Sequence, residues 1–317
     1  MWIFLIVSTL AWGIAEIFYK KGCLQNEKYS HLKVTILVGF FMGIYALVEL
    51  FAGGVDLKSF PLNFIYYLPV ATCYIVSMVC SYFGVRFIQE SIADPIENSS
   101  GAIVAILCAI FLHEKLGPLP IVAIAIILVG LVCVSIFDRS EKQKREKSLG
   151  KKIAVFAIAM PFCYMLLDAV GTFLDIFYTG SAVDTVLVNV TEANIEHTAN
   201  CAYEFTFFIV ALILYIFIRI KKQKLFEING ETQSGGVIAK ISAQKWKILA
   251  AIFEVIGQAT YLFALSEGSG IAAVILGAGT VIISLILSRI FLKEKLNLFQ
   301  YIFILIIVGG IIMLSLV

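Results

Sequence analysis

The chain alternates long apolar runs with short polar connections, and this pattern limits the folds that it can adopt. A helix needs about 20 apolar residues to cross the hydrocarbon core of a bilayer. Runs near this length lie at 2–19, 34–52, 64–88, 92–112, 118–137, 153–178, 196–219, 246–266, 270–291 and 298–316. They are too long and too evenly apolar for barrel strands, which alternate polar and apolar residues. The sequence therefore predicts an all-α polytopic membrane protein with ten transmembrane helices.

The composition favours a bilayer over a soluble core. Hydrophobic residues make up 61% of the chain and charged residues 15%, whereas charged residues make up about 25% of a soluble domain. Most of the seven cysteines lie inside apolar runs and none forms a C-x-x-C pair, which favours packing over metal binding or disulfides. Neither a G-x-x-x-x-G-K-[ST] loop nor an H-E-x-x-H pair occurs. We therefore expect no enzyme activity, cofactor, metal or nucleic-acid partner.

Basic residues gather in alternate connections. Counted with their flanking helix ends, the connections after the first, third, fifth, seventh and ninth runs hold all 24 lysines and arginines except Lys58 and Lys115. Basic loops remain in the cytoplasm. Both chain ends are therefore predicted to face away from the cytoplasm, in a multi-pass protein of the plasma membrane.

One charged phrase occurs twice, as FLHEKL at 111–116 and as FLKEKL at 291–296, each time closing an apolar run. Upstream of it, residues 81–96 align with residues 260–275 without a gap. This repetition predicts a first five-helix repeat at 1–137, a basic cytoplasmic linker at 138–152 and a second five-helix repeat at 153–317. Because five is odd, the second repeat must be inverted in the membrane, an arrangement typical of secondary transporters.

These residues resemble the drug/metabolite transporter superfamily, of the ten-helix EamA-like type. Members of that family have two five-helix repeats, and helices 4 and 9 often close with a phrase like F-L-G-E-x-L, matched here by 111–116 and 291–296. The family's tryptophan near the middle of helix 1 matches Trp12. The family's proline in helix 4 has no match at Ser100-Gly101, and many members keep their termini in the cytoplasm. The resemblance implies the fold and a transport function, and it leaves the substrate and the direction of transport open.

Carboxylates inside apolar runs are candidates for function, because a charge at the centre of a membrane helix costs about 2.5–3.5 kcal/mol on insertion scales. Seven of them are selected as candidates: Glu16, Asp94, Glu97, Asp168, Asp175, Glu204 and Glu254. Glu49 ends its run and is expected to be solvated. Arg86 lies near the end of another run and is expected to extend to the cytoplasmic surface, with an ion pair to Asp94 or Glu90 as the alternative.

Helical spacing places most of these acids on faces with other polar or aromatic side chains. The predicted substrate-binding residues are Trp12, Glu16, Tyr74, Glu97, Asn98, Tyr164, Asp168, Glu204, Glu254, Gln258 and Tyr261. Acids supply negative charge, and the faces of Trp and Tyr attract ammonium groups. A buried carboxylate can also exchange a proton for a substrate. The alternative for each acid is a hydrogen-bonded packing role near a helix end.

Together these features predict a secondary active transporter that moves a small organic solute by alternating access. The leading substrate is a cationic or zwitterionic amine or metabolite, coupled to protons. One alternative is a neutral or anionic metabolite, with the acids used only for proton coupling. Another is a non-transporting intramembrane lipid-handling or sensor protein, although a lipid enzyme would need basic residues at the interface and the clusters here are acidic and deeper. An internally duplicated chain can form its inverted pair alone, so we expect a monomer whose partners are the solute and the bilayer.

Overall fold

The computed structural model describes residues 2–113, 116–137, 150–180, 183, 185–226 and 241–314, without the side chains of 2, 132, 134–137, 262–278 and 314. Within these residues the secondary structure is helical and contains no strand. The helices are α1 (Trp2–Gly22), α2 (Ser30–Ala52), α3 (Phe60–Gly84), α4 (Glu90–Glu97), α5 (Ser100–Phe111), α6 (Pro118–Phe137), α8 (Lys151–Thr179), α9 (Ile195–Ile220), α11 (Lys245–Leu287), the π-helical turn η1 (Ser288–Leu292) and α12 (Leu298–Leu314).

Six helical stretches of the described chain are long and apolar enough to cross a membrane. They are α1, α2, α3, α4 together with α5, α8 and α9. Shorter apolar helices cover Pro118–Leu131, Gly279–Leu292 and Leu298–Met313. The all-helical membrane architecture predicted from the sequence is therefore confirmed in outline, and the number of ten crossings stays a prediction.

The run at 92–112 divides into two helices, which hydropathy did not predict. α4 ends at Glu97 and α5 begins at Ser100. At the break, Asn98 Nδ2 donates to the backbone oxygen of Asp94 at 3.1 Å, and Ser99 Oγ donates to that of Pro95 at 2.7 Å. Such side-chain bonds compete with the helical backbone pattern. Pro95 also lacks the backbone N–H that would continue the pattern within α4.

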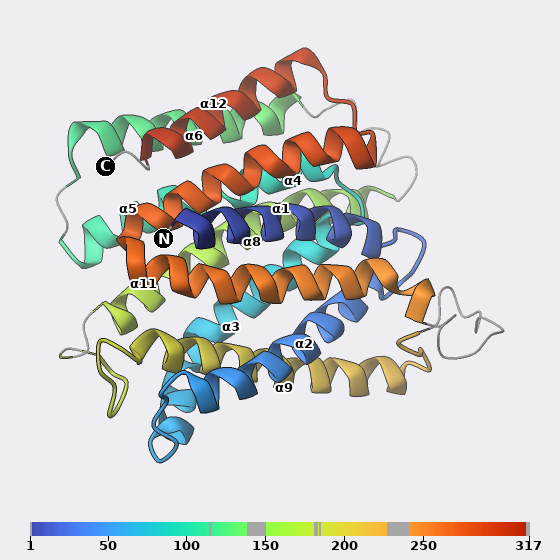
Figure 1. The fold of residues 1–317 in the computed structure, drawn as a ribbon. Helices are drawn as coiled ribbons and strands as arrows, with labels where there is room; N and C mark the ends of the chain where they lie inside the picture. The colour runs from blue at the N-terminus through green and yellow to red at the C-terminus, as the bar shows by residue number, and fades with distance from the viewer. Residues whose placement is uncertain are drawn as a thin grey trace.

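α11 replaces the two helices predicted at 246–266 and 270–291 with one helical stretch. A straight helix of its 43 residues would be about 65 Å long, more than twice the ~30 Å hydrocarbon core. Instead α11 folds back on itself, and its two limbs flank α1 (Figure 1). Gly257, on the first limb, lies against the Trp12 ring, whereas Ile283, on the second limb, lies against Gly13. Both limbs therefore pack on α1 close to its middle.

The repeated phrase ends a helix in both copies. α5 ends at Phe111 and η1 ends at Leu292, each within the phrase. The third residue of each copy is left-handed, with φ of 56° at His113 and 55° at Lys293. Helices commonly end at a residue in the left-handed backbone conformation, and that residue is usually a glycine. The repetition in the sequence thus corresponds to the same backbone conformation in both places.

Close helix pairs build the bundle. α1 packs on α11, α2 on α9, α3 on α8 and α9, and α6 on α12 (Figure 1). The α6–α12 contact is reciprocal, because Gly130 lies against Ile307 while Gly310 lies against Ile127. Glycine lets membrane helices approach closely. α4 contacts both α1 and α11, so these three helices meet around the candidate site.

Candidate functional site

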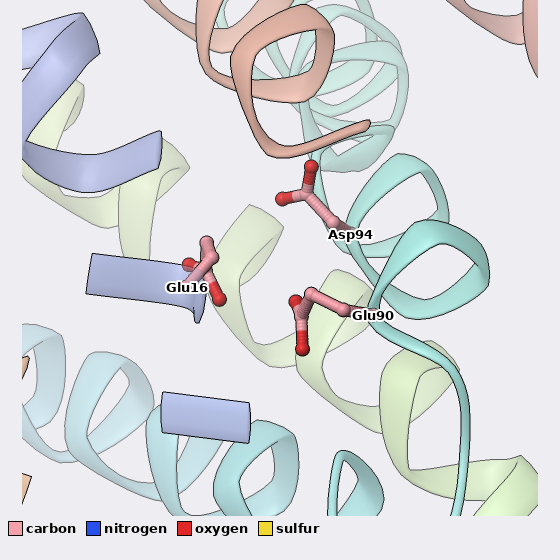
Figure 2. A group of neighbouring side chains, drawn as sticks. All are labelled: Glu16, Glu90 and Asp94. Carbon is pink, nitrogen blue, oxygen red and sulfur yellow. The ribbon is translucent and has the colours of Figure 1, made fainter. Parts of the chain in front are cut away.

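Three carboxylates from α1 and α4 face one another. An oxygen from each of Glu16, Glu90 and Asp94 lies within 4.8 Å of the others, and the side chains point into the space between the two helices (Figure 2). The side chain of Glu90 is 0% exposed, and neither of its carboxylate oxygens has a hydrogen-bond partner among the described residues. Carboxylates at this range repel one another when ionised. This group, the acidic triad, therefore needs protons or a cation to remain buried.

Glu294 holds α4 in place from the other half of the chain. It is the glutamate of the second copy of the repeated phrase, FLKEKL at 291–296. Its Oε1 accepts from the backbone N of Glu90 and its Oε2 from that of Ser91, both at 2.9 Å, while Ser91 Oγ donates to the same Oε2 at 2.5 Å. The first N–H groups of a helix lack partners within it and favour negative charge. Glu294 thus caps α4 and positions the two triad residues on that helix.

Asp94 is held more firmly than Glu90. Asn98 Nδ2 donates to Asp94 Oδ1 at 2.7 Å, and the Ser284 hydroxyl of α11 donates to Oδ2. Glu97, one turn further along α4, is buried and its Oε1 lacks a partner in the described chain. The two predicted residues Glu97 and Asn98 therefore border the acidic triad, and Asn98 orients one of its members.

Aromatic side chains surround a fourth carboxylate, Glu254 of α11. The hydroxyl of Tyr19 donates to Glu254 Oε2 at 2.5 Å. The Trp12 indole lies beside the same carboxylate, with Nε1 outside hydrogen-bonding geometry. Its ring centroid lies 5.1 Å from that of Tyr261. The structure thus brings together the predicted residues Trp12, Glu254 and Tyr261, and adds Tyr19.

A polar chain between α2, α9 and α11 contains two more predicted residues. Gln258 Nε2 donates to Asn200 Oδ1 at 2.7 Å, and Asn200 Nδ2 donates to Glu204 Oε1 at 3.2 Å. Glu49 Oε2 meets His197 Nδ1 at 2.6 Å, and the Glu49 side chain is 3% exposed. The prediction that Glu49 is solvated was wrong, because α9 covers the end of α2.

Tyr74, Tyr164 and Asp168 lie where α3, α5 and α8 meet. Tyr74 Oη donates to Thr172 Oγ1 at 3.1 Å, and the Ser100 side chain lies close to the Asp168 carboxylate. Tyr164 interacts electrostatically with Asp168. The eleven predicted residues thus fall into neighbouring groups on several helices.

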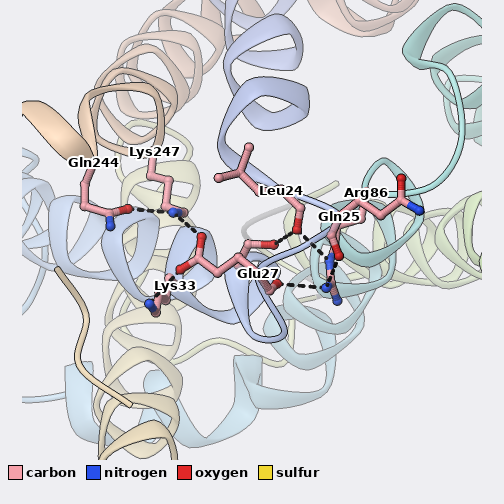
Figure 3. A network of polar contacts seen from close by, with 8 residues as sticks. Leu24, Gln25, Glu27, Lys33, Arg86, Gln244 and Lys247 are labelled. Atoms are coloured by element: carbon pink, nitrogen blue, oxygen red, sulfur yellow. Dashed lines mark hydrogen bonds and ion pairs between the residues drawn. The ribbon is translucent and has the colours of Figure 1, made fainter. Parts of the chain in front are cut away.

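Arg86 belongs to a separate, paired network (Figure 3). It is 8% exposed and donates to the backbone oxygens of Leu24, Gln25 and Glu27 at 3.3, 3.3 and 2.8 Å. The prediction that it extends to the surface was wrong, because the connection between α1 and α2 folds over it. Burial lowers the pKa of Arg86, and the nearby Cys23 and Glu27 oppose that shift.

The rest of this paired network centres on the Glu27 carboxylate. Lys33 Nζ lies 2.6 Å from Glu27 Oε1, and Lys247 Nζ lies 2.8 Å from Oε2. Lys247 also donates to Gln244 Oε1 at 2.5 Å. The sequence predicted none of these contacts, and it did not select Glu90, Tyr19 or Glu294. A one-turn spacing between Glu90 and Asp94 was the available signal for the first of them.

Comparisons with known proteins agree with this architecture. The EamA-like transporter family matches the chain over residues 1–136 and 176–316, and no curated protein matches it. A solved crystal structure of another protein shares the fold with a TM-score of 0.59 and 12% sequence identity, over 99% of this chain and 96% of that one. Because the family match covers both halves, the chain belongs to the EamA-like transporter family and is a multi-pass membrane protein.

Proposed function

We propose that the protein is a secondary active transporter that moves a small cationic or zwitterionic amine or metabolite in exchange for protons. Its family consists of membrane transporters of small solutes. The observation that carries the substrate class is the environment of Glu254, a buried carboxylate beside the Trp12 and Tyr261 rings. A carboxylate balances the charge of an ammonium group, and aromatic faces attract it further.

We further propose alternating access between inverted five-helix repeats at 1–137 and 153–317. In such a relation α1, α2, α3 and α6 correspond to α8, α9, the first limb of α11 and α12. The main helix pairs follow it: α2 packs on α9 and α6 on α12, and the α1–α11 pair corresponds to the α3–α8 pair. The reciprocal glycine–isoleucine contacts of α6 and α12 support the same relation. Rocking of one repeat against the other would open a central site to each side in turn. Residues 138–149 of the proposed linker lie outside the described residues.

A neutral or anionic metabolite is the second candidate, with the acids used only for proton coupling. The bonded amides of Gln258 and Asn200 favour it, because they offer donors and acceptors without net charge. Plasma-membrane location, chain ends outside the cytoplasm and a monomeric state remain proposals from the sequence.

Uptake into proteoliposomes tests the proposal. After a thermal-shift screen of amines, amino acids, sugars and nucleosides selects a solute, its uptake is measured across a range of pH for the wild type and for Glu254→Gln. Glutamine keeps the size and loses the charge, so we expect normal folding with abolished transport or a lost pH dependence. Asp168→Asn should behave in the same way. Asp175→Asn is a matched control, because Tyr67 donates to Asp175 at 2.6 Å just as Tyr19 donates to Glu254. Full uptake by Glu254→Gln with an unchanged pH profile would refute the role of Glu254.

A further inference from the structure

The acidic triad has more negative charge than its surroundings balance. Lys20 lies one turn from Glu16 on α1, and its ammonium group donates to the backbone oxygens of Val85, at 2.6 Å, and of Ile88. Among the described residues, Lys20 thus supplies one positive charge beside three carboxylates. Burying an unpaired charge is costly, so the arrangement indicates a positive ligand that is bound during function.

Glu90 is the observation that separates this group from an ordinary acidic cluster. It is fully buried, and neither of its oxygens has a hydrogen-bond partner in the described chain. One of them lies within 4.8 Å of an oxygen of Glu16 and an oxygen of Asp94 (Figure 2). The buried Glu16 Oε2 also lacks a partner there. By contrast, Asp94 has donors on both oxygens. Unsatisfied buried polar atoms need an explanation. A cation held between the three carboxylates would provide it.

We propose that Glu16, Glu90 and Asp94 bind a hard divalent cation of the size of Ca²⁺. All three ligands are carboxylates, which suit hard cations such as Ca²⁺, Mg²⁺ and Mn²⁺ rather than Zn²⁺ or Cu²⁺. Mg²⁺ usually keeps several waters and is bound through one or two carboxylates, whereas Ca²⁺ takes more protein oxygens in a flexible geometry. The triad offers three carboxylates whose oxygens lie within 4.8 Å of one another, an arrangement that suits Ca²⁺ better. The sequence alone predicted no metal here.

The elements around the triad make the site specific. Glu90 and Asp94 lie on the short helix α4, which Glu294 caps at one end and the break before α5 limits at the other. Discontinuous helices form the ion sites of many secondary transporters. A bound cation would join α1 to α4, whose cap comes from the second repeat. It would therefore stabilise the arrangement of helices seen in this structure, whichever solute the protein carries.

Thermal unfolding of the purified full chain in detergent tests the site. After treatment with a chelator, CaCl2, MgCl2 and MnCl2 are titrated from about 10 µM to about 10 mM, a range that includes weak Ca²⁺ sites. KCl at matched ionic strength is the control. We expect a saturable rise in melting temperature that is largest with Ca²⁺. Stabilisation by KCl to the same extent as by CaCl2, or by none of the salts, would overturn the site, and a larger effect of Mg²⁺ or Mn²⁺ would overturn the assignment of Ca²⁺.

Variants connect the binding to the triad. Glu90→Gln and Asp94→Asn should raise the half-saturating Ca²⁺ concentration by at least about 10-fold, whereas Asp175→Asn should bind as the wild type does. Tb³⁺ luminescence is a second readout, because Trp12 and Tyr19 lie one turn on either side of Glu16 and can sensitise a bound lanthanide. If a variant does not fold, Glu16→Gln replaces it. Unchanged binding in the folded triad variants would overturn the proposal. Neither readout uses a transported solute, so a failure of the proposed amine transport would not affect this result.

Discussion

Two groups of buried charge lie near the end of the bundle where α1 stops and α4 begins, and only one of them is balanced. In the paired network the Glu27 carboxylate meets Lys33 and Lys247 at 2.6 and 2.8 Å, and Arg86 donates to three backbone oxygens. In the acidic triad the carboxylates meet mainly one another. Both groups are buried in the protein, and they have opposite electrostatic character.

This difference separates structural charge from binding charge. Buried charges that are fully paired hold their elements in one arrangement, although they add little net stability over apolar residues. The paired network ties the α1–α2 connection to α2, α3 and α11 in this way. An unpaired buried charge instead reduces stability unless a ligand arrives, and ionisable residues of that kind in membrane helices are associated with transport paths. Mutations in the two groups should therefore have opposite effects.

The largest effect should come from Glu27→Gln. This change leaves two buried ammonium groups without their carboxylate, and breaking a buried ion pair typically costs about 3–5 kcal/mol. We expect a clearly lower melting temperature in detergent and a smaller monodisperse fraction on size-exclusion chromatography. A melting temperature equal to that of the wild type would show that the paired network is not structural.

Glu294→Gln should have the next largest effect, because Glu294 connects the two kinds of region. It is buried like the triad but accepts hydrogen bonds on both oxygens. Glutamine keeps one acceptor and loses the charge at the start of α4, and a lost helix cap costs about 1 kcal/mol. We expect a modest loss of thermal stability together with weaker Ca²⁺ binding. A loss of stability with unchanged Ca²⁺ affinity would show that the triad does not depend on this cap.

Glu90→Gln should change stability in the other direction when no cation is present. Two unit charges 4 Å apart interact by about 4 kcal/mol at the effective dielectric near a protein surface, and protonation relieves most of that repulsion. We therefore expect a gain of up to about 1 kcal/mol in chelator at neutral pH, which added Ca²⁺ should erase as the wild type gains stability. If the variant were less stable than the wild type in chelator, Glu90 would have a structural role instead of a binding role.

The sequence predicted the fold where hydropathy alone determines it. Apolar runs located α1, α2, α3, α6, α8, α9 and α12 to within several residues. The break between α4 and α5 depends on the side-chain bonds of Asn98 and Ser99, which hydropathy does not register. The runs predicted at 246–266 and 270–291 correspond to the two limbs of α11 (Figure 1). Their joining into one helix was not predicted, and the polar stretch 266–270 contains no proline that would end a helix there.

The sequence identified acids but not their partners. The cost of burying charge in a membrane selected Glu16, Glu97 and Glu254 as candidates, and whether they bind a solute stays a prediction. Glu90 joins Glu16 across 74 residues of sequence, and Glu294 joins Glu90 across 204. Helical periodicity relates residues within one helix only, so contacts at such separations require the tertiary arrangement. The same reason explains the buried position of Glu49.

Lys247→Met should have the smallest effect and tests the paired network from its other side. Methionine fills a similar volume and removes one of the two cations on Glu27, which keeps its 2.6 Å contact with Lys33. The freed Gln244 amide has an Nε2 group without a hydrogen-bond partner in the described chain, so it can turn toward the carboxylate. Because Glu27 keeps a charged partner, the roughly 3–5 kcal/mol cost of a broken buried ion pair does not apply. We expect a melting temperature close to that of the wild type and far above that of Glu27→Gln. If Lys247→Met were as unstable as Glu27→Gln, the network would depend on both ion pairs at once. The paired network would then balance its buried charge only slightly better than the acidic triad does.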